Sequence, residues 1–189
     1  MSNDIDASVP ACVTTRCCVA GGGPAGMMLA LLLARAGIAV SVLEKHADFL
    51  RDFRGDTIHP STLEIVHELG LLDELLREPH QELREVSATF GDASFALADF
   101  THLPTHCKFI AMMPQWNFLN FIAHHAQRYP AFDLRMEAEV TDLIEEGEVV
   151  VGVRASTPQG PLEVRADLVI GADGRHSTVR ARSGLEIIG

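Results

Sequence analysis

The chain contains few cysteines and few basic residues, and both shortages exclude classes of protein. Only four of its 189 residues are cysteine, too few and too irregularly spaced for a disulfide framework, and no Cys-x-x-Cys pair indicates a zinc site. We expect reduced, mostly buried thiols. Lysine and arginine number 15 against 26 aspartate and glutamate, a formal net charge of −11. Because no basic cluster offsets this charge, nucleic acid and anionic membrane surfaces are excluded as expected partners.

A secretory signal and an uninterrupted membrane span are also missing. Residues 1–6 are acidic in character, where a signal peptide carries a basic region. Residues 17–34 are uncharged over a length at which a membrane helix must be considered, but the helix-breaking segment Gly21–Pro24 interrupts them. The composition, 47% hydrophobic and 22% charged, is typical of a globular domain. We therefore expect a cytoplasmic protein without a membrane partner.

The first part of the chain predicts a βαβ unit. A flexible lead-in over residues 1–14 precedes a short apolar run at residues 17–20. Residues 24–36 have helical periodicity, ended by Gly37, and a second apolar run covers residues 38–43. Strand, glycine turn, helix and strand in this order form a βαβ unit, whose parallel strands are apolar throughout because helices cover both faces.

The rest of the chain adds helices and an antiparallel excursion from the parallel sheet. Helices are predicted over residues 60–69, 71–77 and 115–129, a half-buried hairpin over 85–98 around Gly91-Asp92, and a strand over 108–112. Further strands are predicted over residues 134–136, 140–144, 149–153, 162–164 and 167–171, the last one buried, before a short helix capped by Ser177. The predicted fold class is α/β.

The segment Gly21–Gly26 fits the pattern G-x-G-x-x-G, which binds dinucleotides when it follows a strand and opens a helix. Both conditions are met here. Gly21 permits a tight turn, Gly23 has no Cβ to obstruct a pyrophosphate, and Gly26 lets the helix pack closely against the strand. The N–H groups at the helix start then face the phosphates. The cofactor-binding residues predicted in this segment are Gly21, Gly23, Pro24, Ala25 and Gly26.

A carboxylate ends the second predicted strand. Glu44 lies where it can accept hydrogen bonds from the ribose hydroxyls of an adenosine, and where it would repel a 2′-phosphate. The alternative is that the glycines serve only the turn and its packing, and that Glu44 is a solvated charge at the strand end.

Neither a metal site nor nucleophilic catalysis is predicted. His102 and His106, like the pair at residues 124–125, have no acidic partner at metal-ligand spacing. Ser177 and its neighbour His176 lack the G-x-S-x-G elbow of hydrolases.

Three separated segments resemble the single-component FAD-dependent aromatic hydroxylases of the para-hydroxybenzoate hydroxylase type. One is the glycine loop together with Glu44-Lys45. Residues 54–64 are similar to the family's arginine-containing segment that leads into a proline-started helix. Residues 167–180 contain an Asp-Gly pair, Asp173-Gly174, which in that family lies near the FAD pyrophosphate and helps NAD(P)H to reach the flavin. The likeness covers nearly the whole chain.

The resemblance also implies cofactor contacts outside the glycine loop. These are Glu44, Lys45, Arg54, Gln115, Val140 and Asp173. Several of them have a structural alternative. Arg54 can be explained as a member of a surface ion pair, and Gln115 as an N-terminal helix cap. Val140 can be explained as a core residue, and Asp173 as a turn residue that caps the Asp-Gly pair.

The fold that the resemblance implies is a Rossmann-like FAD-binding domain over residues 15–189, with a parallel sheet and an antiparallel β-meander excursion. Residues 85–112 would begin the sheet of a substrate-binding subdomain. The implied activity is that of a monooxygenase that binds FAD, uses NAD(P)H as co-substrate and hydroxylates a small aromatic substrate with O₂.

The family's C-terminal half, with its Gly-Asp-Ala-Ala-His segment, is missing from this sequence. We therefore expect an N-terminal portion of such an enzyme, inactive by itself, and assign no catalytic side chain. Two alternatives are a non-catalytic, truncated FAD-binding fragment and another FAD- or NAD-linked oxidoreductase.

Overall fold

The structure, a computed structural model, describes residues 10–50 and 56–186. Its contacts divide the chain into two compact units. Residues up to Phe49 and from Ile122 onward form one of them, here called the sheet unit, and the residues from Leu50 to Phe121 form the other, called the hairpin unit.

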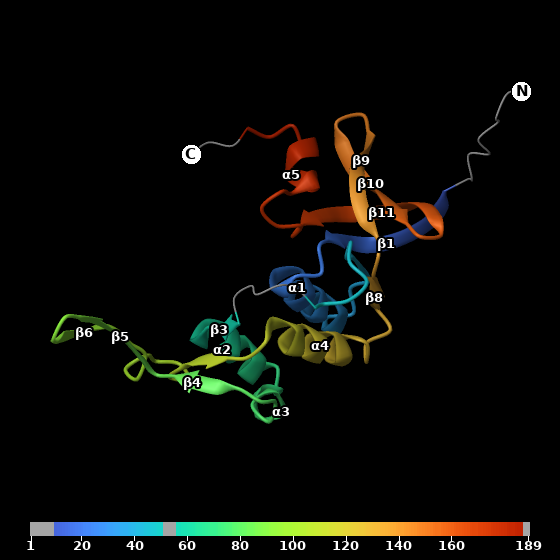
Figure 1. Cartoon of the computed structure of the whole chain (residues 1–189). Coiled ribbons are helices and arrows are strands. Elements are labelled where there is room, and N and C mark those ends of the chain that lie inside the picture. Colours follow the sequence, from blue (N-terminus) through green and yellow to red (C-terminus); the bar gives the residue numbers. More distant parts are fainter. Residues whose placement is uncertain (1–9, 51–55, 187–189) are drawn as a thin grey trace, which may run out of the picture. The chain divides into compact units, whose positions relative to one another are not determined.

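The sheet unit contains a six-stranded sheet with the strand order β8-β2-β1-β11-β10-β9 (Figure 1). Strands β8, β2, β1 and β11 are parallel, whereas β10 runs antiparallel to both β11 and β9. The predicted α/β fold, with a parallel sheet and an antiparallel excursion, is confirmed. The bounds of the strands are β1 Ala11–Ala20, β2 Val40–Leu43, β8 Phe132–Arg135, β9 Glu139–Glu146, β10 Val149–Thr157 and β11 Gly160–Gly171.

Helix α1, Pro24–Arg35, connects β1 to β2 and packs against both strands. Proline occupies its first turn, where the missing N–H costs no hydrogen bond, and Gly37 with φ of 76° ends it. Its buried side chains include Met27 and Leu31, but Leu32 is exposed. Every residue of β2 is buried, as expected for a parallel strand inside an α/β sheet.

Strand β1 begins earlier than the sequence indicated. Residues 11–14, expected to belong to the lead-in, pair in parallel with residues 162–165 of β11. Residues 17–20 then pair with β2 on one side and with β11 on the other. The length of β1 is therefore set by its partner β11 and not by its own apolar run.

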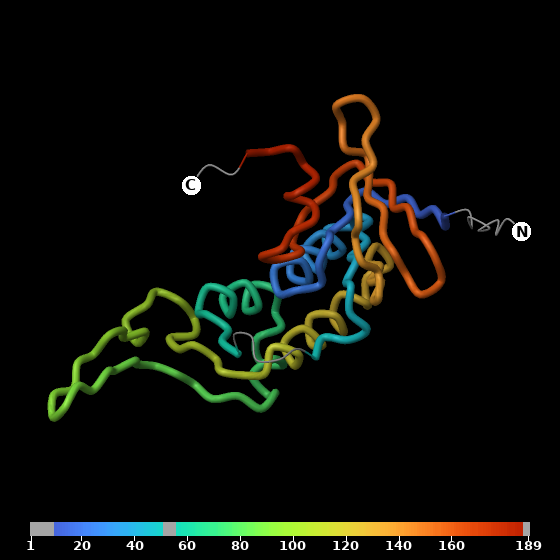
Figure 2. Tube along the Cα trace, turned by 45° about the horizontal axis from the view of Figure 1, so that its top comes forward, coloured from blue at the N-terminus to red at the C-terminus, as the bar shows by residue number. Residues whose placement is uncertain are grey.

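Strand β11 is a single long strand, where the sequence predicted two. Its first part pairs with β10 as far as Arg165, and the chain trace in Figure 2 shows the successive hairpins β9-β10 and β10-β11. Beyond that point β1 is the partner of β11 among the strands that the structure describes. The expected burial of residues 167–171 is wrong: Leu168 is 56% exposed, and none of these five residues is fully buried.

The apolar residues of β10 and β11 form one buried cluster of the sheet unit with the ends of β1 and β2. Val153 and Val164, which face each other across β10 and β11, are fully buried there, together with Ala20 and Leu43 at the ends of β1 and β2. This buried cluster thus extends to the ends of β1 and β2, the strands after which the predicted site residues Gly21 and Glu44 follow.

Helix α5, Thr178–Arg182, packs against β9 and β11. The predicted cap is confirmed, because Ser177 Oγ accepts a hydrogen bond from Arg180 N at 3.0 Å. Within the described ranges, none of the helices combines the length and apolar character needed to cross a bilayer.

The hairpin unit contains a small antiparallel sheet, β3-β7-β4, and short helices. Helix α2 starts at its predicted proline and ends before Gly70, whose φ is 74°. The bounds are β3 Thr57–Ile58, α2 Pro60–Glu68, α3 Leu72–Leu75, β4 Gln81–Leu83, β7 Ile110–Met112 and α4 Gln115–Ala126, which continues into the sheet unit.

Strands β5, Glu85–Phe90, and β6, Ala93–Asp99, form the predicted hairpin. Gly91, with φ of 61°, allows the two-residue turn between them. The expected half-burial is confirmed at Val86 and Ala88 of β5. It is wrong at Phe90, Phe95 and Leu97, which are 71%, 55% and 65% exposed. Among the described strands β5 pairs only with β6, so the hairpin forms a sheet of two strands.

The four cysteines are free thiols, and all lie in the described part of the chain. Cys17, Cys18 and Cys107 are buried, as expected, and Cys12 is exposed. Burial, assisted by the neighbouring Cys17, raises the pKa of Cys18 to about 12. The adjacent pair Cys17-Cys18 therefore packs as small apolar residues.

Candidate cofactor-binding site

The carboxyl ends of three parallel strands bring the predicted residues of the sheet unit to one edge of the sheet. Gly21 follows β1, Glu44 follows β2, and Ala172-Asp173 follow β11. Because β1 lies between β2 and β11, the glycine loop is flanked on both sides. Ligands of open α/β sheets bind outside this edge.

Gly21 makes the turn out of β1, with φ of 105°, a conformation that side chains rarely adopt. Its N–H donates to the carbonyl oxygen of Leu43 at 2.8 Å. A Cβ at Gly21 would lie 2.4 Å from the carbonyl oxygen of Ala172. Backbone from both neighbouring strands therefore fixes the start of the loop, and only glycine fits there.

Gly23 stands at the start of α1 in open space, because a Cβ built on it would meet no atom within 4 Å. No side chain caps the helix at this residue, and the first turn contains no acidic residue. Pro24 and Ala25, the first residues of the helix, are exposed. The positive end of the helix dipole thus faces an opening that suits an anion.

Glu44 is buried, with 7% of its surface exposed, and its carboxylate holds backbone on both sides. Oε2 accepts a hydrogen bond from Gly22 N at 2.9 Å, and Oε1 accepts one from His46 N at 3.0 Å. A Cβ at Gly22 would lie 2.9 Å from the Cβ of Glu44. The alternative of a solvated strand-end charge is therefore wrong.

This loop-holding role of Glu44 was not predicted from the sequence. The only signal was the middle glycine of the Gly21-Gly22-Gly23 run, to which the dinucleotide pattern assigns no function. Each carboxylate oxygen can accept two hydrogen bonds, so holding the loop and accepting ribose hydroxyls are compatible.

The segment that precedes Val140 is hydrogen-bonded to Glu44 at this edge of the sheet. Glu44 N donates to the carbonyl oxygen of Arg135, and the carbonyl oxygen of Glu44 accepts from Ala138 N, both at 2.9 Å. Val140 follows two residues later in β9 and is buried in the core of the sheet unit. Its side chain has the structural role that the alternative described.

Asp173 receives three hydrogen bonds from the start of α5. Oδ2 accepts from Thr178 N at 2.6 Å and from Val179 N at 3.1 Å, and Oδ1 accepts from Ser177 Oγ at 2.5 Å. The carboxylate thus caps the helix that follows it, not only its own turn.

The remaining predicted residues are Lys45, Gln115 and Arg54. Lys45 is exposed next to Glu44. Gln115 belongs to the hairpin unit, where its N–H donates to Asp56 Oδ1 at 3.2 Å at the start of α4. Arg54 lies outside the described residues. The structure therefore brings together Gly21–Gly26, Glu44 and Asp173, with the segment leading to Val140 beside them.

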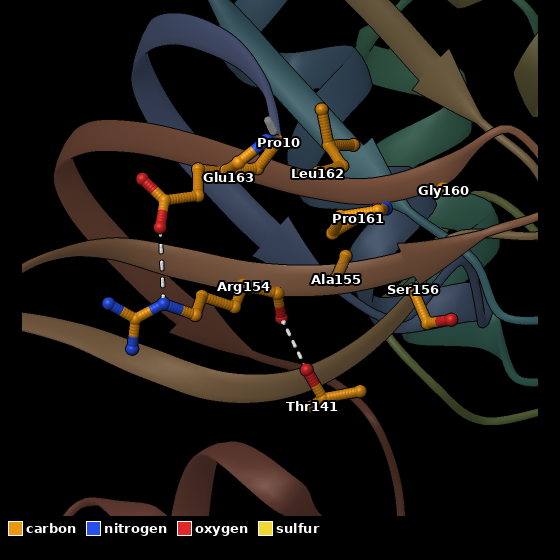
Figure 3. A pocket seen from close by; sticks show the side chains of 9 residues that line it. All are labelled: Pro10, Thr141, Arg154, Ala155, Ser156, Gly160, Pro161, Leu162 and Glu163. Atoms are coloured by element: carbon orange, nitrogen blue, oxygen red, sulfur yellow. Dashed lines mark hydrogen bonds and ion pairs between the residues drawn. The ribbon is translucent and has the colours of Figure 1, made fainter. Parts of the chain in front are cut away.

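A separate groove lies at the opposite ends of the strands (Figure 3). Pro10, Gly160 and Pro161 line it at the starts of β1 and β11. Its two charged side chains form an ion pair with each other, in which Arg154 Nε donates to Glu163 Oε1 at 3.1 Å. We do not assign the cofactor to this groove because it is remote from the carboxyl ends of β1 and β11. No group of three metal-ligating side chains occurs in residues 10–50 and 56–186.

The parallel sheet, the glycine loop and the carboxylate after β2 together define a dinucleotide-binding α/β domain. Residues 14–189 match the FAD binding domain family, and the chain belongs to that family. The predicted resemblance is thereby confirmed, and FAD is the cofactor of this family.

The chain is similar to bacterial monooxygenases. It is 34% identical over 171 residues to 6-methylpretetramide 4-monooxygenase of Streptomyces rimosus, covering 90% of this chain and 41% of that protein. The p-nitrophenol 4-monooxygenase of Pseudomonas putida superposes with a TM-score of 0.80 at 28% identity, covering 95% of this chain and 45% of that one. Anhydrotetracycline hydroxylase of Streptomyces rimosus gives 0.80 at 29% identity, covering 94% and 35%. The chain thus spans less than half the length of these relatives.

Proposed function

We propose that this chain is the FAD-binding portion of a cytoplasmic, NAD(P)H-dependent flavoprotein monooxygenase that hydroxylates a small aromatic compound with O₂. The observation that carries the proposal is the open space at Gly23, at the uncapped start of α1 and beside the buried Glu44. Support also comes from the relatives, whose names describe monooxygenases and a hydroxylase.

In this proposal the start of α1 binds the pyrophosphate of FAD. The N–H groups of Gly23, Ala25 and Gly26 belong to the first turn, where helix N–H groups have no partner within the helix. Pro24 has no N–H and contributes its fixed φ. The anion is held by backbone dipoles, which act over one turn and are therefore compatible with the net charge of −11.

The adenosine would lie on the side of β2. Glu44, held by Gly22 and His46, presents a preorganised carboxylate to the ribose hydroxyls. Lys45 and the backbone at Val140 would flank the same part of the cofactor. The contacts of Arg54 and Gln115 with FAD remain predictions from the family resemblance.

FAD, when bound, would supply the redox chemistry, and this chain would bind and orient it. We assign no catalytic side chain. Residues 85–112, which include the exposed hairpin, are proposed as the beginning of the part that receives the aromatic substrate.

Titration of the purified chain with FAD and with ADP tests the proposal. Bound flavin absorbs near ~450 nm and changes its fluorescence, whereas ADP probes the pyrophosphate and adenosine contacts alone. Gly23→Val should abolish binding of both ligands by filling the pyrophosphate space, while the folded content measured by circular dichroism stays that of the wild type. A folded wild-type chain that takes up neither ligand contradicts the proposal.

A further inference from the structure

The segment that connects β8 to β9 contains a residue with a strained backbone. Glu137 has φ of 54°, and in the described part of the chain it is the one residue other than glycine with a positive φ. Glycine and asparagine adopt this left-handed conformation much more readily than glutamate does. Strain of this kind persists where the surrounding structure enforces it. The side chain of Glu137 is exposed, so packing in the core is not what enforces it here.

Backbone hydrogen bonds join residues 135–138, here called the clamp, to the end of β2. Glu44 N donates to the carbonyl oxygen of Arg135, and Ala138 N donates to that of Glu44, both at 2.9 Å. Glu137 N donates to the carbonyl oxygen of His46 at 3.0 Å. The conformation of Glu137 sets the angle between its own N–H and that of Ala138. An extended residue would point these two donors in opposite directions, whereas here both reach residues 44–46.

The clamp is fixed at both of its ends. Strand β8 pairs in parallel with β2 as far as Arg135, which lies beside Leu43. Ser41 Oγ, buried on β2, also donates to Asp133 Oδ2 of β8 at 3.1 Å. After the clamp the chain enters β9, where Val140 belongs to the buried cluster of the sheet unit. The clamp must therefore cross the end of β2 within a few residues, and the strain at Glu137 follows from this crossing.

The clamp contacts the residues that hold the carboxylate of the site. His46 N donates to Glu44 Oε1 at 3.0 Å, and Gly22 N donates to Glu44 Oε2 at 2.9 Å. Through its carbonyl oxygen the same His46 is bound to Glu137 N. A movement of the clamp therefore changes the place of His46, and with it the place of the Glu44 carboxylate.

We propose that Glu137 is a positioning residue for the cofactor site, because its left-handed backbone holds His46 and thereby the carboxylate of Glu44. The role belongs to the backbone of Glu137 and not to its carboxylate. This inference rests on the proposed function of Glu44 as the residue that receives the ribose hydroxyls.

The test compares three substitutions of Glu137 in ADP titrations. Glu137→Val puts a β-branched side chain into the left-handed conformation and raises the strain, Glu137→Gln removes only the charge, and Glu137→Gly removes the strain. We expect the Kd for ADP to rise about tenfold in Glu137→Val and to stay within about threefold of wild type in the other two variants. Wild-type binding by a folded Glu137→Val would overturn the proposal.

Two comparisons identify what the loss in Glu137→Val means. Glu139→Val makes the same change at the exposed first residue of β9, where an extended strand suits valine, and should leave ADP binding unchanged. A loss in Glu137→Gln as large as that in Glu137→Val would assign the role to the carboxylate, as a direct contact with the ligand, and would overturn the proposal.

Amide hydrogen exchange without ligand measures the clamp itself, and it decides the question if Glu137→Val does not fold. Asparagine and glutamine are both uncharged amides, but asparagine adopts the left-handed conformation more readily. After correction for intrinsic rates, the amide of Ala138 should exchange several-fold more slowly in Glu137→Asn than in Glu137→Gln. Equal rates in these two variants would overturn the proposal.

Amide NMR spectra report the place of the Glu44 carboxylate through its two donors, Gly22 N and His46 N. Both resonances should shift in Glu137→Val and keep their wild-type positions in Glu139→Val. Unchanged resonances in folded Glu137→Val would contradict the positioning role. Failure of the wild-type chain to bind ADP or FAD would instead contradict the proposed function, and the exchange comparison would still decide the role of Glu137.

Discussion

A Cβ on Gly26 would lie 2.1 Å from the carbonyl oxygen of Gly21, whereas one on Gly23 would meet no atom within 4 Å. The two glycines of one motif therefore have different reasons to be glycine. Gly26 is required because α1 packs tightly against the turn. Gly23 instead leaves space that a bound ligand can occupy.

Alanine substitutions should separate these two reasons. We expect Gly26→Ala to lower the free energy of unfolding by about 1–3 kcal/mol through overpacking, and Gly23→Ala to change it by less than about 0.5 kcal/mol. Urea unfolding followed by circular dichroism measures both. Equal stabilities of the two variants would contradict the assignment of Gly26 to packing.

Glu44→Gln should weaken both the fold and the binding of ADP. The amide keeps one oxygen for Gly22 N or His46 N but turns an NH₂ toward the other donor, leaving a buried N–H without its acceptor. We expect a loss of about 1–3 kcal/mol in urea unfolding and a weaker ADP affinity. Glu146→Gln, in an exposed pair with Arg165, is the control and should stay near wild type. A wild-type stability for Glu44→Gln would disprove the loop-holding role.

Thiol labelling of the native chain should modify Cys12 first. Cys17, Cys18 and Cys107 are buried, and burial raises the pKa of each of these thiols, so their reactive thiolate is scarce near pH 8. Labelling with a chromogenic disulfide reagent should give one fast thiol in the folded state and four in denaturant. Cys12→Ser should remove the fast phase, and rapid labelling of a second thiol in the native state would contradict the burial of one of the other three thiols.

The raised pKa of Cys18 also predicts how stability changes at alkaline pH. The folded state keeps the Cys18 proton up to about pH 12, whereas the unfolded chain releases it near its ordinary pKa of about 8.5. The contribution of Cys18 to the free energy of unfolding is therefore fully present below the unfolded pKa, and it is lost as the pH rises from there towards the folded pKa. Cys18→Ala should show a smaller decline in unfolding free energy between about pH 9 and pH 11 than the wild type.

The exposed face of the β5-β6 hairpin should contribute little to the stability of the chain. Phe90→Ser and Phe95→Ser remove side chains that are mostly exposed, and each should change the free energy of unfolding by less than about 0.5 kcal/mol. Leu63→Ala, at a fully buried position of α2 in the same unit, should cost about 2–5 kcal/mol. A large loss for Phe90→Ser would show that this face is covered in solution.

The sequence was sufficient for the βαβ unit and for the glycine loop, because these depend on local patterns. Apolar runs predicted β1 and β2, and the positions of Gly21 and Gly70 predicted the turns that their positive φ angles confirm. The order of the strands placed Glu44 at the same edge as the loop without any knowledge of contacts.

The missed features depend on partners that are distant in the sequence. Strands β3 and β4 are too short to show a periodicity, and pairing with β7 creates them. In β11 the polar side chain of Arg165 divides the apolar runs, although it is simply the outward residue of a half-buried strand. The hydrogen bonds of Asp173 to α5 likewise depend on a fold that the local pattern does not describe.

The pairing of β1 with β11 also has a consequence for synthesis on the ribosome. Ala20 lies beside Gly171, so β1 waits for a strand that is synthesised much later before its second edge is filled. Contacts of such sequence separation slow folding, since a long loop must close first. In a nascent chain that has not yet released residues 160–173, the glycine loop is flanked by β2 but not by β11. We therefore expect flavin binding to follow translation of β11.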